Sequence, residues 1–324
     1  MRLYDDARKL VVYLGYPKAG NNRDLRTIVG TGFLIEHDNT SYLVTAGHVA
    51  QLLEDRSVGV RLTDRRNFAR VLEFSNIKWW FHQDASVDVA AMEFSTPEWA
   101  DVSPWHTKWF VTAFKRGTKN IGAGDMAHIV GAFKFLPGTK RNMPTVHTGH
   151  IALMADEEPI PIKHWRTEGY LIEAQTLDTL SGSPVLVRRS LTTKMKISNL
   201  DSKPLNVWLH GSLWLLGLWH GAWYGKPKER GRIPGNDVRI PAGMGICVPA
   251  IKIIEVLERA ELKTNRAKVK AAEAARNAPE LQSAEPAFAT GDDILRVALR
   301  TQPIPQKKPK AKRAKRSRVG VSNK

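Results

Sequence analysis

Short apolar runs separated by turn residues fill the chain as far as about Leu262, and this pattern most limits the folds it can adopt. The runs are four to eight residues long and rich in Val, Ile, Leu and aromatic side chains. They include 10–16, 31–37, 41–46, 59–62, 70–74, 88–94, 149–154, 169–174, 183–188, 213–220 and 244–249. Runs of this kind predict an all-β sandwich or barrel rather than an alternation of strands and helices.

Only two helices are predicted before residue 263. One follows Ala46 with the sequence HVAQLLE, and the other covers 249–262, where apolar residues recur on one helical face. A proline-containing connector between Phe94 and Val111 divides the strands into two halves of similar size. We therefore expect a first domain at 1–110 and a second domain at 111–262, which includes the closing helix.

The composition changes after Leu262. Residues 263–324 are rich in Ala, charged and small polar side chains, which cannot bury enough apolar surface to offset the entropy of an ordered chain. We expect a low-complexity, disordered tail, apart from one short amphipathic helix at 292–300. Residues 301–324 hold six lysines, three arginines and no acidic residue, which is nine of the seventeen net positive charges.

The basic tail 301–324 admits three interpretations. It is a solvated extension that aids solubility, or its cations bind the phosphates of nucleic acid with release of counterions. The segment has no aromatic side chain, so it offers no platform for base stacking. Attachment to an anionic membrane surface is the third interpretation, without a lipidation motif to support it.

Apolar stretches and cysteine content limit the location of the protein. No stretch approaches the roughly 18–20 apolar residues that a membrane helix needs, so we expect no membrane span. The N-terminal residues, which include Asp5 and Asp6, lack the apolar core of a signal peptide. Cys247 is the single cysteine, so no internal disulfide can form. Together these features predict a cytoplasmic protein.

Three segments each place one reactive side chain beside small residues. His48 follows Thr-Ala-Gly at the end of a predicted hairpin, Asp88 opens an apolar strand, and Ser181 lies in the turn Ser-Gly-Ser-Pro. A serine hydroxyl needs an adjacent base to become a nucleophile at neutral pH, and histidine suits that role. A buried carboxylate then holds the imidazole in the required tautomer. These residue types together indicate nucleophilic catalysis.

The strings VTAGHV, DVAAMEF and SGSPVLV resemble the three signature blocks of chymotrypsin- and trypsin-like serine proteases, in that family's order of His, Asp and Ser. The spacings, 40 residues from His48 to Asp88 and 93 from Asp88 to Ser181, are similar to those of the family. Two further similarities are the string GTGFLIE, which resembles the family's strand before the histidine, and LLGLWHG followed by MGICVPAIKIIEVLE, which resembles its substrate-binding strand, closing strand and helix. The resemblance covers roughly residues 10–262.

This resemblance implies two antiparallel six-stranded β-barrels with an active site between them. It implies a serine endopeptidase that acts on a protein or peptide substrate and needs neither a metal nor an organic cofactor. The implied catalytic residues are His48, Asp88 and Ser181, with the backbone N–H groups of Thr179 and Ser181 as the oxyanion hole. The implied substrate-binding residues are Gln175, His220, Gly221 and Ala222.

Two positions depart from the family pattern. The family usually has glycine where this chain has Thr179, and Leu180 replaces an aspartate that activates secreted zymogens. The first departure leaves an alternative open, in which the chain is a weak or inactive protease-fold binding module whose basic tail binds nucleic acid. The second predicts that activation by that aspartate salt bridge is absent.

Ordinary structural roles remain open for each reactive residue. Ser181 could be a turn serine, His48 a buried histidine at a helix start, and Asp88 a strand cap, with Asp84 as a nearby competitor. His147 and His150 form an H-x-x-H pair, but the sequence shows no third zinc ligand.

Overall fold

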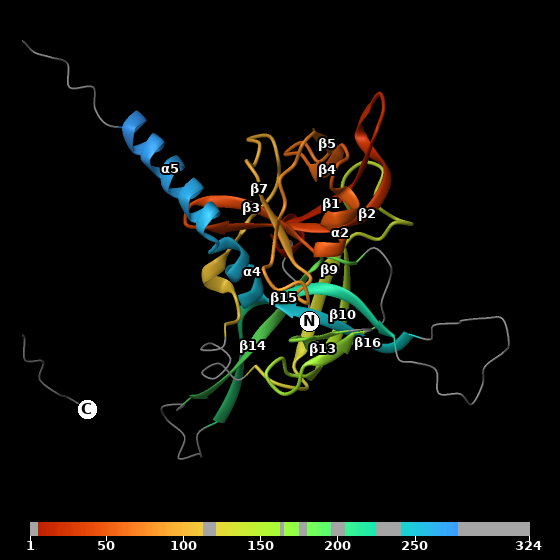
Figure 1. The fold of residues 1–324 in the computed structure, drawn as a ribbon. Helices are drawn as coiled ribbons and strands as arrows, with labels where there is room; N and C mark the ends of the chain where they lie inside the picture. The colour runs from red at the N-terminus through yellow and green to blue at the C-terminus, as the bar shows by residue number, and fades with distance from the viewer. Residues whose placement is uncertain are drawn as a thin grey trace, which may run out of the picture. The chain divides into compact units, whose positions relative to one another are not determined.

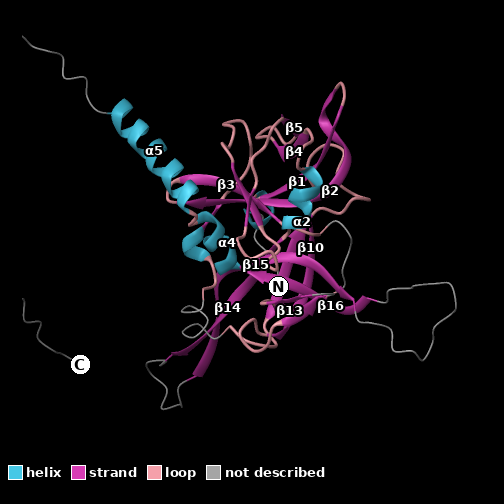
Figure 2. Cartoon of the chain, in the orientation of Figure 1, coloured by secondary structure: helices cyan, strands magenta, loops and turns pink. Residues whose placement is uncertain are grey.

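The computed structural model describes residues 6–112, 121–162, 165–174, 180–195, 205–224 and 241–277, and these residues are mostly β-structure (Figures 1 and 2). The first half contains β1 (Val11–Lys18), β2 (Asn21–His37), β3 (Thr40–Thr45), β4 (Val58–Thr63), β5 (Ala69–Phe74), β6 (Trp80–Phe81), β7 (Ala90–Glu93) and β8 (Trp105–His106). The second contains β9 (Met126–Gly131), β10 (Thr145–Leu153), β11 (Ile160–Ile162), β12 (Trp165–Thr167), β13 (Tyr170–Glu173), β14 (Pro184–Met195), β15 (Leu205–Tyr224) and β16 (Pro241–Pro249).

Six strands of the second half form a closed antiparallel barrel in the order β10-β13-β16-β15-β14-β9. Its interior is filled by apolar side chains that alternate along the strands, including Ile129, Ile172, Val185 and Trp219, all fully buried. The thiol of Cys247 is also buried in this core, and burial raises its pKa well above the ordinary value. The barrel expected for this half is present.

The first half is an open sheet, which corrects the expectation of a second closed six-stranded barrel. Its strands follow the order β5-β4-β1-β2-β3-β7-β6, and β8 pairs with β2 in parallel. No ladder joins the end strands β5 and β6 in the described residues. The core on this sheet is nonetheless extensive, with Tyr13, Phe33, Leu43 and Val60 fully buried.

The interrupted pairing of β1 with β2 explains part of this open geometry. The register between the two strands shifts beside Gly15 and on both sides of Pro17, and a proline has no N–H to give to a ladder. At the other edge, β6 is only two residues long and pairs with β7 alone. Strand β2 lies against β5 without a ladder between them, so the sheet curls but does not close.

The helices differ from the sequence expectation mainly at the C-terminal end. Helix α2 (Gly47–Leu53) follows Ala46 as predicted, and a further short helix, α1 (Asp6–Lys9), precedes β1. The predicted helix at 249–262 is instead α4 (Ala250–Leu257), followed by a second helix, α5 (Ala260–Asn277). We expected no stable structure at 263–277, and α5 contradicts that expectation. The Ala, Lys and Glu residues of α5 are strong helix formers, so a helix forms there despite the low apolar content.

The chain separates into two compact units, residues 1–271 and 272–324, and α5 runs from the first into the second. The division at 110 and 262 that the sequence suggested stays a prediction. None of the helices in the described ranges is long and apolar enough to cross a membrane.

Candidate active site

His48 lies at the second position of α2, where the chain turns out of strand β3. Gly47 precedes it, and a Cβ atom at Gly47 would lie 3.0 Å from Asp88 Oδ1, so the small residue allows the carboxylate to approach. The backbone N–H of His48 donates a hydrogen bond to Asp88 Oδ1 at 2.8 Å. The carboxylate of Asp88 therefore hydrogen-bonds to the first turn of α2, the same turn that carries the imidazole of His48.

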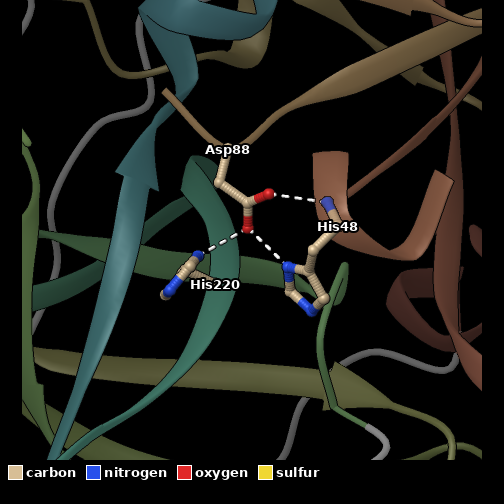
Figure 3. Close-up of side chains that lie close together, drawn as sticks. All are labelled: His48, Asp88 and His220. Atoms are coloured by element: carbon tan, nitrogen blue, oxygen red, sulfur yellow. Dashed lines mark hydrogen bonds and ion pairs between the residues drawn. The ribbon is translucent and has the colours of Figure 1, made fainter. Parts of the chain in front are cut away.

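Asp88 lies just before β7, between the buried side chains of Val87 and Val89. Its Oδ2 atom is 2.8 Å from His48 Nδ1 (Figure 3). A carboxylate accepts hydrogen bonds, so this contact assigns the proton to Nδ1 and leaves Nε2 of His48 with a free lone pair. The competing Asp84 instead accepts a hydrogen bond from the nearby backbone N–H of Ser86.

His220, on strand β15, brings a second imidazole to the same carboxylate. Its Nδ1 atom is 2.5 Å from Asp88 Oδ2, and Figure 3 shows Asp88 between the two histidine rings. The two rings lie edge to face with centroids 5.5 Å apart. The sequence placed His220 near the substrate but did not reveal this contact, because no local pattern links it to Asp88.

The environment of Asp88 favours its charged form. Burial on its own would raise the pKa of this carboxyl, but the hydrogen bonds from His220 and His48 outweigh it and hold the pKa well below its usual range. Asp88 is therefore ionised throughout the neutral pH range.

Ser181 lies in the tight turn that enters β14. Gly182 has φ of +85°, a conformation that favours glycine, and the N–H of Ser183 donates to Leu180 O to close the turn. Ser181 Oγ donates to the carbonyl oxygen of His220 at 3.1 Å. Within the described residues, it forms no hydrogen bond with the ring of His48.

The turn of Ser181 packs directly against the segment that carries His48. A Cβ atom at Gly182 would overlap Thr31 O and Thr45 Oγ1 and lie 3.1 Å from the backbone nitrogen of Ala46. In addition, the N–H of Thr31 donates to Ser181 O at 2.9 Å. Residues remote in sequence, near 31, 45 and 181, therefore meet at one place.

The strand segment 220–222 passes beside the serine. Gly221 has φ of +149°, and a Cβ atom placed on it would lie 3.8 Å from Ser181 Oγ. Ala222 pairs with Gly245 in the neighbouring strand β16. This segment therefore lies directly beside the hydroxyl of Ser181.

Some of the predicted residues, Gln175, Thr179 and the tail 301–324, lie outside the described residues.

The two histidines of the H-x-x-H pair lie on one strand, β10. His147 and His150 are three positions apart on this strand, so their side chains point to opposite faces of it. They belong to none of the three-residue clusters of metal-binding side chains in the described ranges.

The chemical capacity of the site follows from these contacts. An ionised carboxylate fixes an imidazole in the tautomer that can accept a proton, and a serine hydroxyl lies on the adjoining turn. The side chain of His48 is 42% exposed, so a solute can reach its free nitrogen.

No family model matches the chain, and no curated protein matches it. Solved structures of trypsin-like serine proteases do match it over most of its length. The Rv3671c protease of M. tuberculosis H37Rv, in an inactive form, is 17% identical with a TM-score of 0.42, and the match covers 78% of this chain and 88% of that one. Deg5 is 19% identical with a TM-score of 0.38, over 58% of this chain and 81% of that one. The HtrA-type protease AlgW with a decapeptide is 12% identical with a TM-score of 0.41, over 78% of this chain and 66% of that one. These similarities carry no residue role over to this chain.

Proposed function

We propose that this protein is a serine endopeptidase in which Ser181 is the nucleophile, His48 the general base and Asp88 the carboxylate that supports the base. The observation that carries the proposal is the 2.8 Å contact of His48 Nδ1 with an ionised Asp88, next to the turn of Ser181. These are the elements of acyl transfer by an activated serine.

The reaction begins with a change of partner by the serine hydroxyl. Ser181 Oγ turns from the carbonyl of His220 toward His48 Nε2, and such contacts are often formed only when substrate binds. His48 takes the hydroxyl proton while Oγ forms a bond to the carbonyl carbon of the peptide. The same ring then gives this proton to the leaving amine as the C–N bond breaks. Water, deprotonated by His48, hydrolyses the acyl-enzyme and restores the serine.

Asp88 remains ionised throughout this cycle. Its negative charge stabilises the imidazolium that forms when His48 carries the extra proton. We assign the oxyanion hole to the backbone N–H groups of Thr179 and Ser181, and we assign Gln175 to the primary specificity pocket. The backbone at His220, Gly221 and Ala222 is assigned to pairing with the substrate.

A fluorophosphonate probe tests the proposal, because it phosphonylates only an activated serine. The wild-type protein should gain one adduct, detected by intact-protein mass spectrometry, and Ser181→Ala should gain none. Ser183→Ala is the matched control, since its Oγ is buried and has no hydrogen-bond partner in the described structure. It should be labelled like the wild type. Equal labelling of wild type and Ser181→Ala would refute the proposal.

The partner of the serine hydroxyl also favours a second candidate function. Ser181 Oγ donates to His220 O and not to His48, which is the arrangement of an unengaged nucleophile. A protein that kept this arrangement would bind peptides without cleaving them. In that case the fluorophosphonate probe would not label the wild type. The unlabelled wild-type protein would still bind peptides from a peptide pool.

A further inference from the structure

The second imidazole at Asp88 is not needed for serine hydrolysis, which uses one histidine on the carboxylate. His48 and His220 nevertheless both direct Nδ1 toward Asp88 Oδ2, at 2.8 and 2.5 Å. One ligand atom from each of the three residues lies within 4.8 Å of the others. Two imidazole nitrogens and one carboxylate oxygen form a common ligand set for a transition-metal ion.

The three residues are attached to separate, well-packed parts of the protein. His48 is on α2, Asp88 lies between buried valines, and His220 is on the barrel strand β15 (Figure 3). Zinc binds nitrogen and oxygen at about 2.0–2.2 Å, so tetrahedral ligands lie about 3.3 Å apart. Each nitrogen must therefore move about 0.5–0.8 Å away from Oδ2 to admit the ion. The three ligand atoms already lie within 4.8 Å of one another, so the rearrangement that the ion requires is small.

The site is accessible, and its negative charge is not already paired with a permanent cation. The side chains of His48, His220 and Asp88 are 42%, 24% and 17% exposed, so an ion can enter from solvent. Among the residues that the structure describes, no lysine or arginine forms an ion pair with Asp88. A divalent cation would therefore meet an ionised carboxylate.

A second three-residue cluster, with one histidine and two carboxylates, provides a contrast. His37, Asp38 and Glu258 also lie within ligand distance of one another. Arg266 forms ion pairs with Asp38 and with Glu258 in this cluster, and Lys263 forms another with Glu258. Permanent cations therefore already neutralise both carboxylates of this cluster. This second cluster is therefore not a candidate site.

We propose that His48, Asp88 and His220 form a binding site for a divalent transition-metal ion such as Zn²⁺. The protein supplies three ligands, His48 Nδ1, His220 Nδ1 and Asp88 Oδ2, and the fourth position is open to water. The ion replaces the two Nδ1 protons that Asp88 accepts in the metal-free protein. Each neutral ring then carries its proton on Nε2, and a ring that was charged releases one proton to solvent.

The consequence for catalysis follows from this tautomer and rests on the proposed function. Once Nε2 of His48 carries a proton, it cannot accept the proton of Ser181. The ion binds His48 Nδ1, the atom that donates to Asp88 in the metal-free protein, and so prevents His48 from activating Ser181. Metal binding itself depends only on the three ligands and can be measured without any activity.

Titration of Co²⁺ into the full-length, untagged protein tests binding directly. Tetrahedral Co²⁺ absorbs visible light, and we expect a band that saturates at one ion per chain and disappears on addition of Zn²⁺. His220→Ser and His48→Gln each remove one ligand and should weaken the affinity at least tenfold. His37→Gln alters only the second cluster and should leave the affinity unchanged.

A second readout connects binding to the serine. Zn²⁺ should lower the rate at which the fluorophosphonate probe labels the wild type, and a chelator should restore it. The rate that remains in His220→Ser should fall only at Zn²⁺ concentrations at least tenfold higher than those that inhibit the wild type. Absence of a one-to-one site, or unchanged affinity in His48→Gln, would overturn the metal proposal. His48→Gln decides the question if circular dichroism shows that His220→Ser is misfolded. Absence of labelling in metal-free wild type would instead refute the protease proposal, while the Co²⁺ titration would still report on the site.

Discussion

Asp88 and Glu258 both accept hydrogen bonds from histidine rings, but their other partners differ. Asp88 meets two imidazoles, whereas Glu258 meets His37 at 2.7 Å together with the cations of Lys263 and Arg266. Lysine and arginine stay charged across the neutral range, so Glu258 is neutralised permanently. Asp88 has no such partner in the described structure and stays able to stabilise a positive charge that appears only transiently on a ring. The difference separates a structural carboxylate from one suited to catalysis.

The largest effect should come from changing the carboxylate of the first cluster. Asp88→Asn replaces an acceptor with a group that also donates, so His48 loses the support for its Nδ1 proton. On the proposed function, peptide hydrolysis should fall by about 10⁴-fold in kcat. Glu258→Gln is the matched change in the second cluster and should leave kcat unaltered. A loss of less than tenfold in Asp88→Asn would erase the functional distinction between the two carboxylates.

A smaller effect, on stability, should come from the cation of the second cluster. Arg266 is 7% exposed and donates to Leu257 O, Tyr42 Oη and Glu258 Oε1. Arg266→Ala leaves buried acceptors without a donor and should lower the free energy of unfolding by about 3 kcal/mol. Urea denaturation measures this change. Lys263→Ala is the control, because its side chain is 55% exposed and such ion pairs contribute about 0–1 kcal/mol.

The smallest expected effect is the dependence of stability on pH that Glu258 provides. The hydrogen bond from Lys263 lowers the pKa of this carboxyl, burial opposes that shift, and the hydrogen bond from His37 adds to it. A carboxyl with a lowered pKa in the folded state stabilises the protein above its ordinary pKa, and this contribution disappears as the pH falls through the lowered value. Glu258→Gln should therefore lose less stability than the wild type between neutral pH and pH of about 3. Parallel curves for the two proteins would show that the pairing contributes nothing.

The sequence predicted the parts of the site that depend on local pattern. Thr-Ala-Gly before His48 indicated a turn into a helix, and the Ser-Gly-Ser-Pro string indicated the turn that positions Ser181. The contact of His48 with Asp88 was predicted from the resemblance and agrees with the structure. These features are encoded within a few residues on either side of the reactive side chain.

Long-range geometry could not be predicted in the same way. Which ring fills the second side of Asp88 Oδ2 depends on how β15 passes the first half of the chain, and nothing near His220 in sequence encodes it. Closure of the first sheet likewise depends on how far β5 and β6 lie from each other after the register shifts at Gly15 and Pro17. Helix α5 was missed because its buried anchors, Leu262 and Arg266, lie in a segment of low apolar content.

The N–H of Thr31 holds Ser181 O, and the hydroxyl of the same threonine accepts the N–H of Ala132. One residue in the middle of β2 therefore anchors both the serine turn and a barrel loop that are synthesised about 100–150 residues later in the chain. The serine turn cannot acquire its final position until the two halves have docked. On the proposed function, a nascent polypeptide therefore gains hydrolytic activity only after both halves have been synthesised and have docked.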